Sequence, residues 1–287
     1  MQTRPSSRAS DAIDRIYAES LVREAGFVMP AHHCHSYYEL FHVEKGACRF
    51  LVEDSIFDLN AGDFMLIPPQ LLHYTRYLFG PCRRSTIFFR GADIDPDIRA
   101  LLPHPDSFLS EAQVFHAPDA HREQISALIE RMITERRLED PYSPPLLKRY
   151  LGELLLLCCR VCVFLRDLPS DIHTTDRQIM LAARYITTHY NEDISMDDIA
   201  SAAGFSANYL SRKFREAAGL GIHQYLVFIR LRHAALELIS TKDTITEIAF
   251  RCGFSDSNYF KDAFKKHYGL SPRDYRKSSG SFPSPSL

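Results

Sequence analysis

The sequence lacks a long uncharged hydrophobic run, and this excludes a membrane-spanning helix. Its most apolar stretch, residues 146–165, carries Lys148, Arg149, Glu153 and Arg160, whereas a helix that crosses a bilayer needs about 20 residues almost free of charge. The N-terminal residues also lack the apolar segment of a secretory signal peptide. We therefore expect a cytoplasmic protein with no membrane segment.

The sequence lacks a disulfide framework and the motifs of common enzymes. The 7 cysteines are odd in number and irregular in spacing, which indicates reduced thiols rather than a disulfide framework. Cys158, Cys159 and Cys162 lie in an apolar helical segment, where cysteine packs as a small hydrophobe. There is no glycine-rich phosphate loop and no nucleophile elbow. We expect no enzymatic activity and name no catalytic residue.

Length and charge divide the chain into two parts. Its 287 residues exceed the usual domain size of about 100–150 residues, so we expect two domains. Residues 175–287 hold 15 Lys+Arg and 12 Asp+Glu, a net +3, and residues 1–174 hold 19 and 24, a net −5. The basic excess rises to 13 against 7 within residues 205–277. This asymmetry indicates that only the C-terminal part contacts a polyanion.

The local pattern changes from strands to helices along the chain. After an arm at 1–20, short runs rich in Phe, Tyr, Val and Ile alternate with Gly and Pro turns up to residue 118, which predicts a barrel or sandwich. The strand candidates are 38–43, 48–53, 63–68 and 85–90. Helical periodicity follows over 120–137 and again over 143–165. A linker is expected at 167–175, with helices beyond it.

The C-terminal third contains a repeat. The pattern of residues 199–225 recurs over 248–275 with one residue inserted. Each copy predicts a short helix that ends at a glycine, Gly204 or Gly253, because glycine adopts the left-handed conformation that closes a helix. A serine two residues later, Ser206 or Ser255, is suited to cap a second helix.

Two helices joined by such a turn form a helix-turn-helix unit, whose second helix can enter the major groove of DNA. Between the units, residues 222–239 predict a helix of about 27 Å, which can place two recognition helices in successive major grooves about 34 Å apart. The alternative is a helical repeat that binds only protein, but such repeats need three or more units to stack.

The second helix of each unit is amphipathic. We expect a buried stripe formed by Tyr209, Leu210 and Phe214 in the first copy and by Tyr259, Phe260 and Phe264 in the second. Asn and Arg side chains on the exposed face can pair with adenine and guanine, and Lys and Ser can bind phosphates. The candidate DNA-binding residues are Asn208, Ser211, Arg212, Arg215, Ser257, Asn258, Lys261, Asp262 and Lys265.

Residues 175–277 resemble the AraC/XylS-type DNA-binding domain, with its signature in AFRCGFSDSNYFKDAFKKHYGLSPRDYR at 249–276. The resemblance implies a regulator, expected to be an activator, that reads promoter DNA and contacts RNA polymerase. The family commonly has Arg or Lys where this chain has Asp262. An acid there cannot bind a phosphate, but it can accept from cytosine N4 or pair with Lys266.

The β-rich half contains several histidines that are candidate ligands. If the segment around His33, His35, Tyr37 and Glu39 is a strand, alternation places these four side chains on one face. With His73 from a facing strand, His33, His35 and Glu39 form a donor set for a divalent transition metal. The other interpretations are a metal-free pocket for an organic effector and a purely structural role.

The spacing of these residues resembles the two cupin motifs, although Gln70 and Tyr77 replace the usual Gly and Asn. A cupin-like barrel is the usual sensor half of AraC/XylS regulators, so the resemblance implies a cupin-like all-β effector-binding and dimerisation domain at 21–166. An all-α DNA-binding domain at 176–277 and a disordered tail at 278–287 follow. A sugar is one candidate effector, and the candidate effector site is His33, His35, Tyr37, Glu39 and His73. The rival interpretation is a metal-dependent cupin enzyme with an appended helical module.

The apolar helix at 143–165 has a hydrophobic stripe too long for one small barrel to cover. In AraC/XylS regulators this position supplies the homodimer contact, and the resemblance implies the same here. The alternative is that the stripe packs on the barrel. The residues concerned are Leu147, Leu151, Leu154, Leu155 and Cys158.

Overall fold

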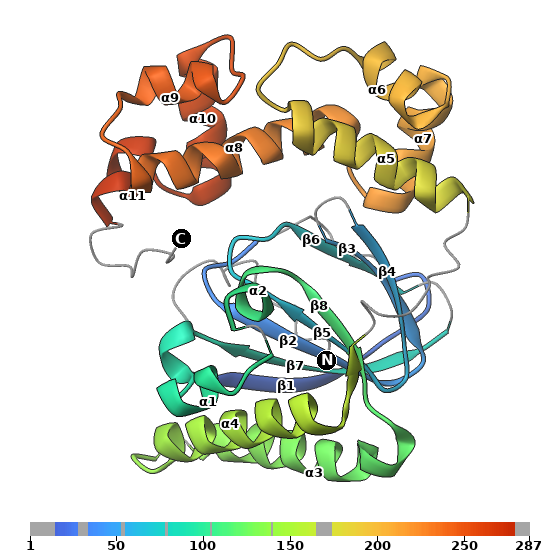
Figure 1. Cartoon of the computed structure of the whole chain (residues 1–287), viewed down its shortest axis with the longest axis vertical. Helices are drawn as coiled ribbons and strands as arrows, with labels where there is room; N and C mark the ends of the chain where they lie inside the picture. The colour runs from blue at the N-terminus through green and yellow to red at the C-terminus, as the bar shows by residue number, and fades with distance from the viewer. Residues whose placement is uncertain are drawn as a thin grey trace, which may run out of the picture. The chain divides into compact units, whose positions relative to one another are not determined.

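The computed structural model describes residues 15–27, 34–52, 55–77, 80–103, 105–138, 140–164 and 174–278. The chain divides into two compact units, Met1–Asp171 and Ile172–Leu287 (Figure 1). The predicted linker at 167–175 lies outside the described residues except for the start of a helix at Thr174. The predicted tail lies outside them after Ser278, the last residue of the final helix.

Among the described residues of the N-terminal unit, the strands form two antiparallel sheets. The six-stranded sheet runs, in spatial order, β1 (Tyr17–Arg23), β7 (Cys82–Phe89), β2 (Tyr38–Lys45), β5 (Asp63–Ile67), β8 (Gln113–His116) and β9 (Val163–Phe164). The second sheet has the order β4 (Ser55–Asn60), β3 (Ala47–Val52) and β6 (His73–Arg76). Strand β1 corrects the predicted arm, because Tyr17–Arg23 pairs along Cys82–Phe88 at the sheet edge.

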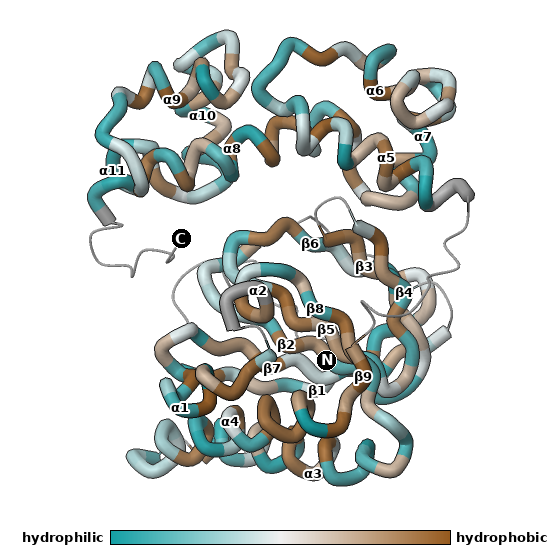
Figure 2. The backbone as a smooth tube through the Cα atoms, viewed as in Figure 1, coloured by the Kyte–Doolittle hydropathy of each residue, from teal (hydrophilic) through white to brown (hydrophobic). Residues whose placement is uncertain are grey.

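Alternation of side chains gives the six-stranded sheet two apolar faces. One face lies against the second sheet, where Phe41 of β2 meets Phe50 of β3 with ring centroids 4.7 Å apart. The other face carries Leu40 and Ile87 and is covered by α3 (Asp119–Arg136) and α4 (Ser143–Val161). Figure 2 shows hydrophobic residues along these helices and the strands above them. The short elements η1 (Gly91–Asp93), α1 (Pro96–Ala100) and α2 (Pro105–Ser110) connect β7 to β8.

The apolar stripe of α4 belongs to the core of the chain itself. Leu147, Leu151, Leu154, Leu155 and Cys158 are all at most 2% exposed, in one cluster with the sheet and α3. Their predicted role as the dimer contact is therefore wrong for this fold, since a side chain without accessible surface has nothing to offer a second subunit. The helix is covered because α3 packs beside it, in addition to the sheet.

Seven helices form the described part, residues 174–278, of the C-terminal unit. They are α5 (Thr174–His189), α6 (Met196–Ala203), α7 (Ala207–Ala218), α8 (Ile222–Ser240), α9 (Ile245–Arg251), α10 (Ser257–Tyr268) and α11 (Pro272–Ser278). The pairs α6–α7 and α9–α10 are the two predicted helix-turn-helix units, and α8 joins them (Figure 1). Its 19 residues span about 28 Å at about 1.5 Å per residue.

The two turns share one backbone arrangement. Gly204 and Gly253 have φ of 68° and 85°, and the next residue in each copy donates its N–H to a carbonyl five residues earlier, Phe205 to Ala200 and Phe254 to Ala249, both at 3.0 Å. These bonds satisfy carbonyls at the helix end. The glycine predictions are confirmed.

The predicted serine caps are only partly present. Ser206 occupies the N-cap position of α7, but its side chain makes no capping hydrogen bond. In the second unit Asp256 replaces Ser255 as the cap, and its carboxylate accepts from the Asn258 N–H at 2.7 Å. The residue inserted in the second copy shifts the cap by one position.

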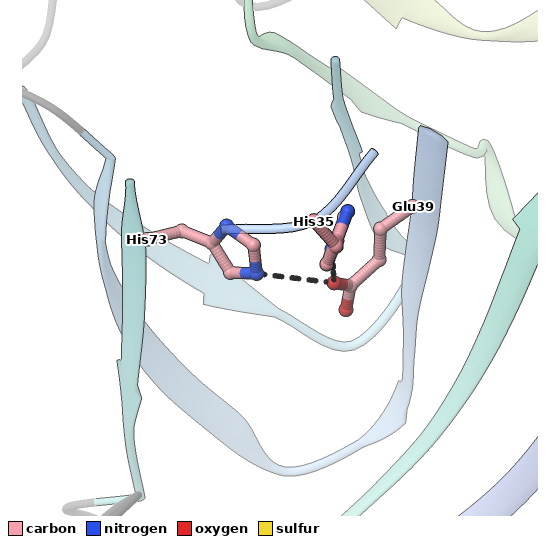
Figure 3. Close-up of side chains that lie close together, drawn as sticks. All are labelled: His35, Glu39 and His73. Carbon is pink, nitrogen blue, oxygen red and sulfur yellow. Dashed lines mark hydrogen bonds and ion pairs between the residues drawn. The ribbon is translucent and has the colours of Figure 1, made fainter. Parts of the chain in front are cut away.

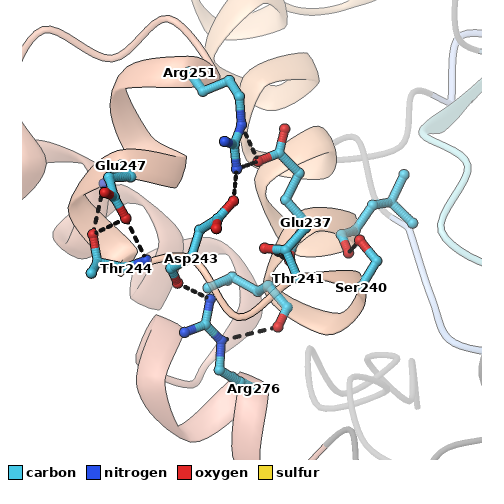
Figure 4. A network of polar contacts seen from close by, with 10 residues as sticks. Glu237, Ser240, Thr241, Asp243, Thr244, Glu247, Arg251 and Arg276 are labelled. Atoms are coloured by element: carbon cyan, nitrogen blue, oxygen red, sulfur yellow. Dashed lines mark hydrogen bonds and ion pairs between the residues drawn. The ribbon is translucent and has the colours of Figure 1, made fainter.

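A polar network fastens the second unit to the end of α8 (Figure 4). The Arg251 guanidinium is 2.6 Å from carboxylate oxygens of both Glu237 and Asp243. Arg276 of α11 donates to the carbonyls of Leu238 and Asp243 at 3.0 and 2.7 Å. Throughout the described residues, no helix is long and apolar enough to cross a membrane.

Candidate functional site

Nine side chains predicted to contact DNA lie on two equivalent helices. Eight of them are exposed and Ser257 is half-buried. The α7 group is Asn208, Ser211, Arg212 and Arg215, and the α10 group is Ser257, Asn258, Lys261, Asp262 and Lys265. Each helix keeps this face free because it buries the opposite one, through Leu210 and Phe214 in α7 and Phe260 and Phe264 in α10.

Local contacts orient the polar side chains of α7. The Arg212 guanidinium lies 5.4 Å from the centre of the Tyr209 ring, and its Nε is 3.9 Å from Glu216 Oε1. Lys213 pairs with the same carboxylate at 2.7 Å. Exposed pairs of this kind contribute little to stability, so Arg212 can exchange them for a base or a phosphate.

Two tyrosines expected in the core are exposed. Tyr209 and Tyr259 retain 37% and 49% of their surface, which corrects the predicted buried stripe in both units. Each lies one position away from the apolar row of its helix, and its ring rests against the phenylalanine of the preceding turn, Phe205 at 4.7 Å and Phe254 at 6.2 Å. The matching positions in the repeat were the available sign that both tyrosines share one environment.

Asp262 is the acidic residue among the DNA-binding candidates on the exposed face of α10. Over the described residues it makes no ion pair with Lys266, one of the two roles expected for it. Its carboxylate is exposed among Lys261, Lys265 and Lys266 of the same helix. The acceptor role toward a cytosine stays a prediction.

A buried cluster joins His35, Glu39 and His73 in the N-terminal unit (Figure 3). Glu39 Oε2 lies 3.1 Å from His35 Nε2 and 3.2 Å from His73 Nε2. Glu39 is on β2 and His73 opens β6, so one residue of each sheet contributes. His35 precedes β2, so the prediction that it lies within a strand is wrong. The Tyr37 ring stacks on the His35 ring, with centroids 4.1 Å apart. His33 lies outside the described residues.

The hydrogen bonds of the two histidines define their tautomers. His35 Nδ1 is 2.8 Å from the Tyr37 carbonyl and His73 Nδ1 is 2.9 Å from the Leu71 carbonyl. A carbonyl only accepts, so we assign the Nδ1 proton in both rings. The Nε2 atoms then present lone pairs to a carboxylate, which also only accepts. A proton on Nε2 or a cation among the three groups resolves this arrangement.

The electrostatics of the cluster favour an ionised Glu39. Burial acts to raise the pKa of Glu39, but the two imidazoles of His35 and His73 beside its carboxylate outweigh it and hold the pKa well below its usual range. Burial lowers the pKa of His35 despite its bond to Glu39. The Tyr37 phenol has its pKa raised to about 12, by burial and then by Glu39.

The donor set fits a divalent transition metal. One ligand atom from each of His35, Glu39 and His73 lies within 4.8 Å of the others, and all three residues are buried. Each Nδ1–H is bound to a backbone carbonyl, which is the outer contact that orients metal-binding imidazoles. Two nitrogens and a carboxylate suit Zn²⁺, Fe²⁺, Mn²⁺ or Ni²⁺.

The face of the six-stranded sheet that carries Glu39 also carries a charged residue that the sequence analysis did not identify. Arg84 and Thr86 on β7 alternate with the helix-facing Ile87 and share the side of Glu39. The Arg84 guanidinium is 3.0 Å from Glu19 Oε1 of β1. Alternation along residues 85–90, extended by one position toward the N-terminus, was the signal that could have found Arg84.

Comparisons with known proteins agree with this division. Residues 19–155 match the model of the AraC-like ligand binding domain, and residues 176–278 match that of a helix-turn-helix domain. The chain belongs to the AraC/XylS family of transcriptional regulators. It is therefore a DNA-binding regulator with a domain for an effector.

Similar proteins cover different shares of this chain. The transcriptional activator RhaS of Escherichia coli O81 is 26% identical over 283 residues, covering 97% of this chain and 96% of that protein. A solved AraC-type regulator from Chromobacterium violaceum is 28% identical over 38% of this chain and 97% of that one, with a TM-score of 0.36. ToxT of Vibrio cholerae O395 is 13% identical over 92% of this chain and 98% of its own, also with a TM-score of 0.36.

Proposed function

We propose that this family member activates transcription by reading promoter DNA with α7 and α10. The observation that carries the proposal is the exposure of polar side chains at equivalent positions of two helix-turn-helix units joined by one helix. Arg212 and Asn208 suit guanine and adenine, and the lysines of α10 suit phosphates.

The test selects a binding site from random duplexes with the full-length protein and then measures affinities. Arg212→Ala should weaken the selected site by about 1–3 kcal/mol and relax one base position. Lys265→Ala should weaken all sequences alike and lower the salt dependence. Arg137→Ala, which removes an exposed arginine from the N-terminal unit, is the matched control. Unchanged affinity and preference in Arg212→Ala would remove α7 from the interface.

We also propose that His35, Tyr37, Glu39 and His73 bind the effector, directly or through a metal. The cluster offers a carboxylate acceptor, two imidazoles and a stacked aromatic ring within one buried region. These groups suit the hydroxyls of a sugar, and the similarity to the transcriptional activator RhaS supports an activating response.

A thermal-shift screen of the full-length protein against sugars, small acids and divalent metals tests this site. A ligand that raises the melting temperature should lose its effect in Glu39→Gln and His73→Ala but keep it in His121→Ala, a half-buried histidine of α3 outside the cluster. A metal-dependent response should disappear with chelator. A double His35→Ala, Glu39→Ala variant with the full response would leave the cluster structural.

The remaining partners follow from the role in transcription. We propose a cytoplasmic, non-enzymatic homodimer that contacts RNA polymerase at its promoter. The dimer contact lies on side chains other than the five buried residues of α4. Sedimentation of the full-length protein tests the dimer, and turnover of any ligand found in the screen would revive the enzyme alternative.

A further inference from the structure

The two helix-turn-helix units are joined by more than α8. Arg230, in the middle of α8, donates from Nε to the Tyr190 carbonyl at 2.7 Å and from Nη2 to the Glu192 carbonyl at 2.9 Å. These carbonyls follow α5, which packs against α6 and α7 and so belongs to the first unit. Carbonyls beyond a helix end lack helical partners and attract a cation.

The same loop touches the turn of the second unit. A Cβ atom on Gly253 would lie 2.7 Å from the Tyr190 oxygen, 2.8 Å from Arg230 Nε and 3.0 Å from Asn191 Cα. Two of these three neighbours are backbone atoms, which cannot rotate away. The glycine that ends α9 therefore also permits the loop of the first unit to lie directly against it.

The repeat supplies an internal comparison. Gly204 occupies the same place in the first unit and has the same left-handed backbone, yet a Cβ there would meet only Gln178 Nε2 at an ordinary 3.6 Å. The turn alone does not demand the close approach at Gly253. The Tyr190 ring adds a second contact, stacked on His233 of α8 with centroids 3.9 Å apart and planes 8° from parallel.

We propose that Arg230, the loop 190–192 and Gly253 form a clamp that fixes the position of α10 relative to α7. The proposal rests on the DNA-reading role proposed above for these two helices. Without the clamp, the units would be held mainly through α8. With it, the loop of the first unit abuts the turn that leads into the second recognition helix. We call the base pairs read by α7 and those read by α10 of one chain the two half-sites. The clamp then determines which spacing between these half-sites the protein accepts, and Arg230 acts as a positioning residue.

The experiment measures binding of full-length protein to the selected site and to versions with one to three base pairs inserted between the half-sites. Each added base pair moves the second half-site by about 3.4 Å and rotates it by about 35°. The wild type should lose at least tenfold in affinity for each of the first insertions. Arg230→Ala should bind the original spacing three- to tenfold more weakly and show a much smaller penalty for insertion, with unchanged affinity for a single half-site. Arg230→Lys should be intermediate, because an ammonium cannot reproduce the planar two-nitrogen contact.

A matched glycine pair keeps the test independent of charge and of folding. Gly253→Ala and Gly204→Ala both place a Cβ atom on a left-handed backbone, but only the Cβ of Gly253→Ala pushes on the clamp. Gly253→Ala should relax the spacing preference, whereas Gly204→Ala should retain it. Folded Arg230→Ala and Gly253→Ala proteins that keep the wild-type insertion penalty would overturn the clamp. Loss of single-half-site binding in Arg212→Ala, measured in the same series, reports on the DNA-reading role separately.

Discussion

Some side chains of the N-terminal unit stay charged although they are largely buried. Glu39 keeps its charge through two imidazoles, and Arg84 keeps its own beside Glu19. His42 on β2 is different, because it is 2% exposed, stacks on Phe64 at 4.1 Å, and its Nδ1 has no hydrogen-bond partner among the described residues. Burying such a group costs stability once it must carry a proton.

His42 should make the N-terminal unit sensitive to acid. Burial, with a smaller contribution from Arg122, lowers its pKa from 6.5 to about 3. The folded state therefore binds fewer protons than the unfolded state below pH 6.5, and stability present above pH 6.5 is lost as pH falls toward 3. The loss at pH 4 should be about 3 kcal/mol. Urea unfolding of the wild type and of His42→Phe between pH 7 and 4 measures it, and parallel pH profiles would contradict the assignment.

Asp262 should limit non-specific DNA binding. Its carboxylate is exposed and unpaired with Lys266 on a helix face that also carries Lys261 and Lys265. Asp262→Arg should strengthen binding to random DNA and steepen its salt dependence, because a new phosphate contact releases another counterion. Asp262→Asn should instead change preference at one base pair if the carboxylate reads a cytosine. Salt titrations of both variants separate these effects, and an unchanged slope in Asp262→Arg would place the residue away from the backbone.

At the scale of elements, equivalent helices are stabilised differently. Helix α7 begins at Ser206 without a side-chain cap, and α10 begins at Asp256 with one. The helices are otherwise alike in length and in their buried rows. The second helix-turn-helix unit also carries the Arg251 and Arg276 network, in which Arg276 donates to the Leu238 carbonyl near the end of α8.

Removing the two N-cap side chains should have unequal effects. Asp256→Ala should cost about 1 kcal/mol, because the Asn258 N–H loses its acceptor. Ser206→Ala should cost close to nothing, since no capping bond is present to lose. Thermal unfolding of the two variants checks the difference, and equal losses would show that Ser206 caps α7 in solution.

Helix α4 should act as core rather than as an interface. Leu155 is 1% exposed within the cluster that joins α4 to the sheet. Leu155→Ala should therefore cost about 2–5 kcal/mol, and Leu155→Glu should prevent the N-terminal unit from folding, because it buries an unpaired charge. Leu156→Glu is the control, because the neighbouring Leu156 is only half-buried. A Leu155→Glu protein that melts like the wild type but sediments as a monomer would restore the original dimer hypothesis.

At the scale of the whole molecule, sensing and reading belong to separate compact units. The cluster of His35, Glu39 and His73 lies wholly in the first, and α7 and α10 lie wholly in the second. Each unit has its own apolar core. Damage confined to one cluster should therefore leave the fold of the other unit intact.

His35→Ala should separate response from binding. The variant should lose the ligand-induced change in promoter activity while its affinity for the selected DNA site without ligand stays within about twofold of wild type, because the cluster and the recognition helices belong to separate compact units. Reporter assays and gel shifts on the same protein measure both quantities. A large loss of ligand-free DNA affinity would show that the cluster supports the DNA-binding unit directly.

Local and repeated features were available from the sequence alone. The glycines of the two turns, the helices on either side and the exposure of eight polar positions follow from periodicity and backbone conformation within about 20 residues. The alternation that placed Glu39 and Tyr37 on one face is equally local. Repetition strengthened these predictions, because two copies of one pattern constrain each other.

Long-range packing decided the rest. The edge position of Tyr17–Arg23, the complete burial of the α4 stripe and the meeting of His35 with His73 depend on segments distant in sequence. The contact of Arg230 with the loop before α6 joins residues 38 to 40 positions apart, and the exposure of Tyr209 and Tyr259 depends on where the neighbouring helices end. An apolar or polar pattern states which faces can be buried, but only the tertiary structure selects the partner that covers each face.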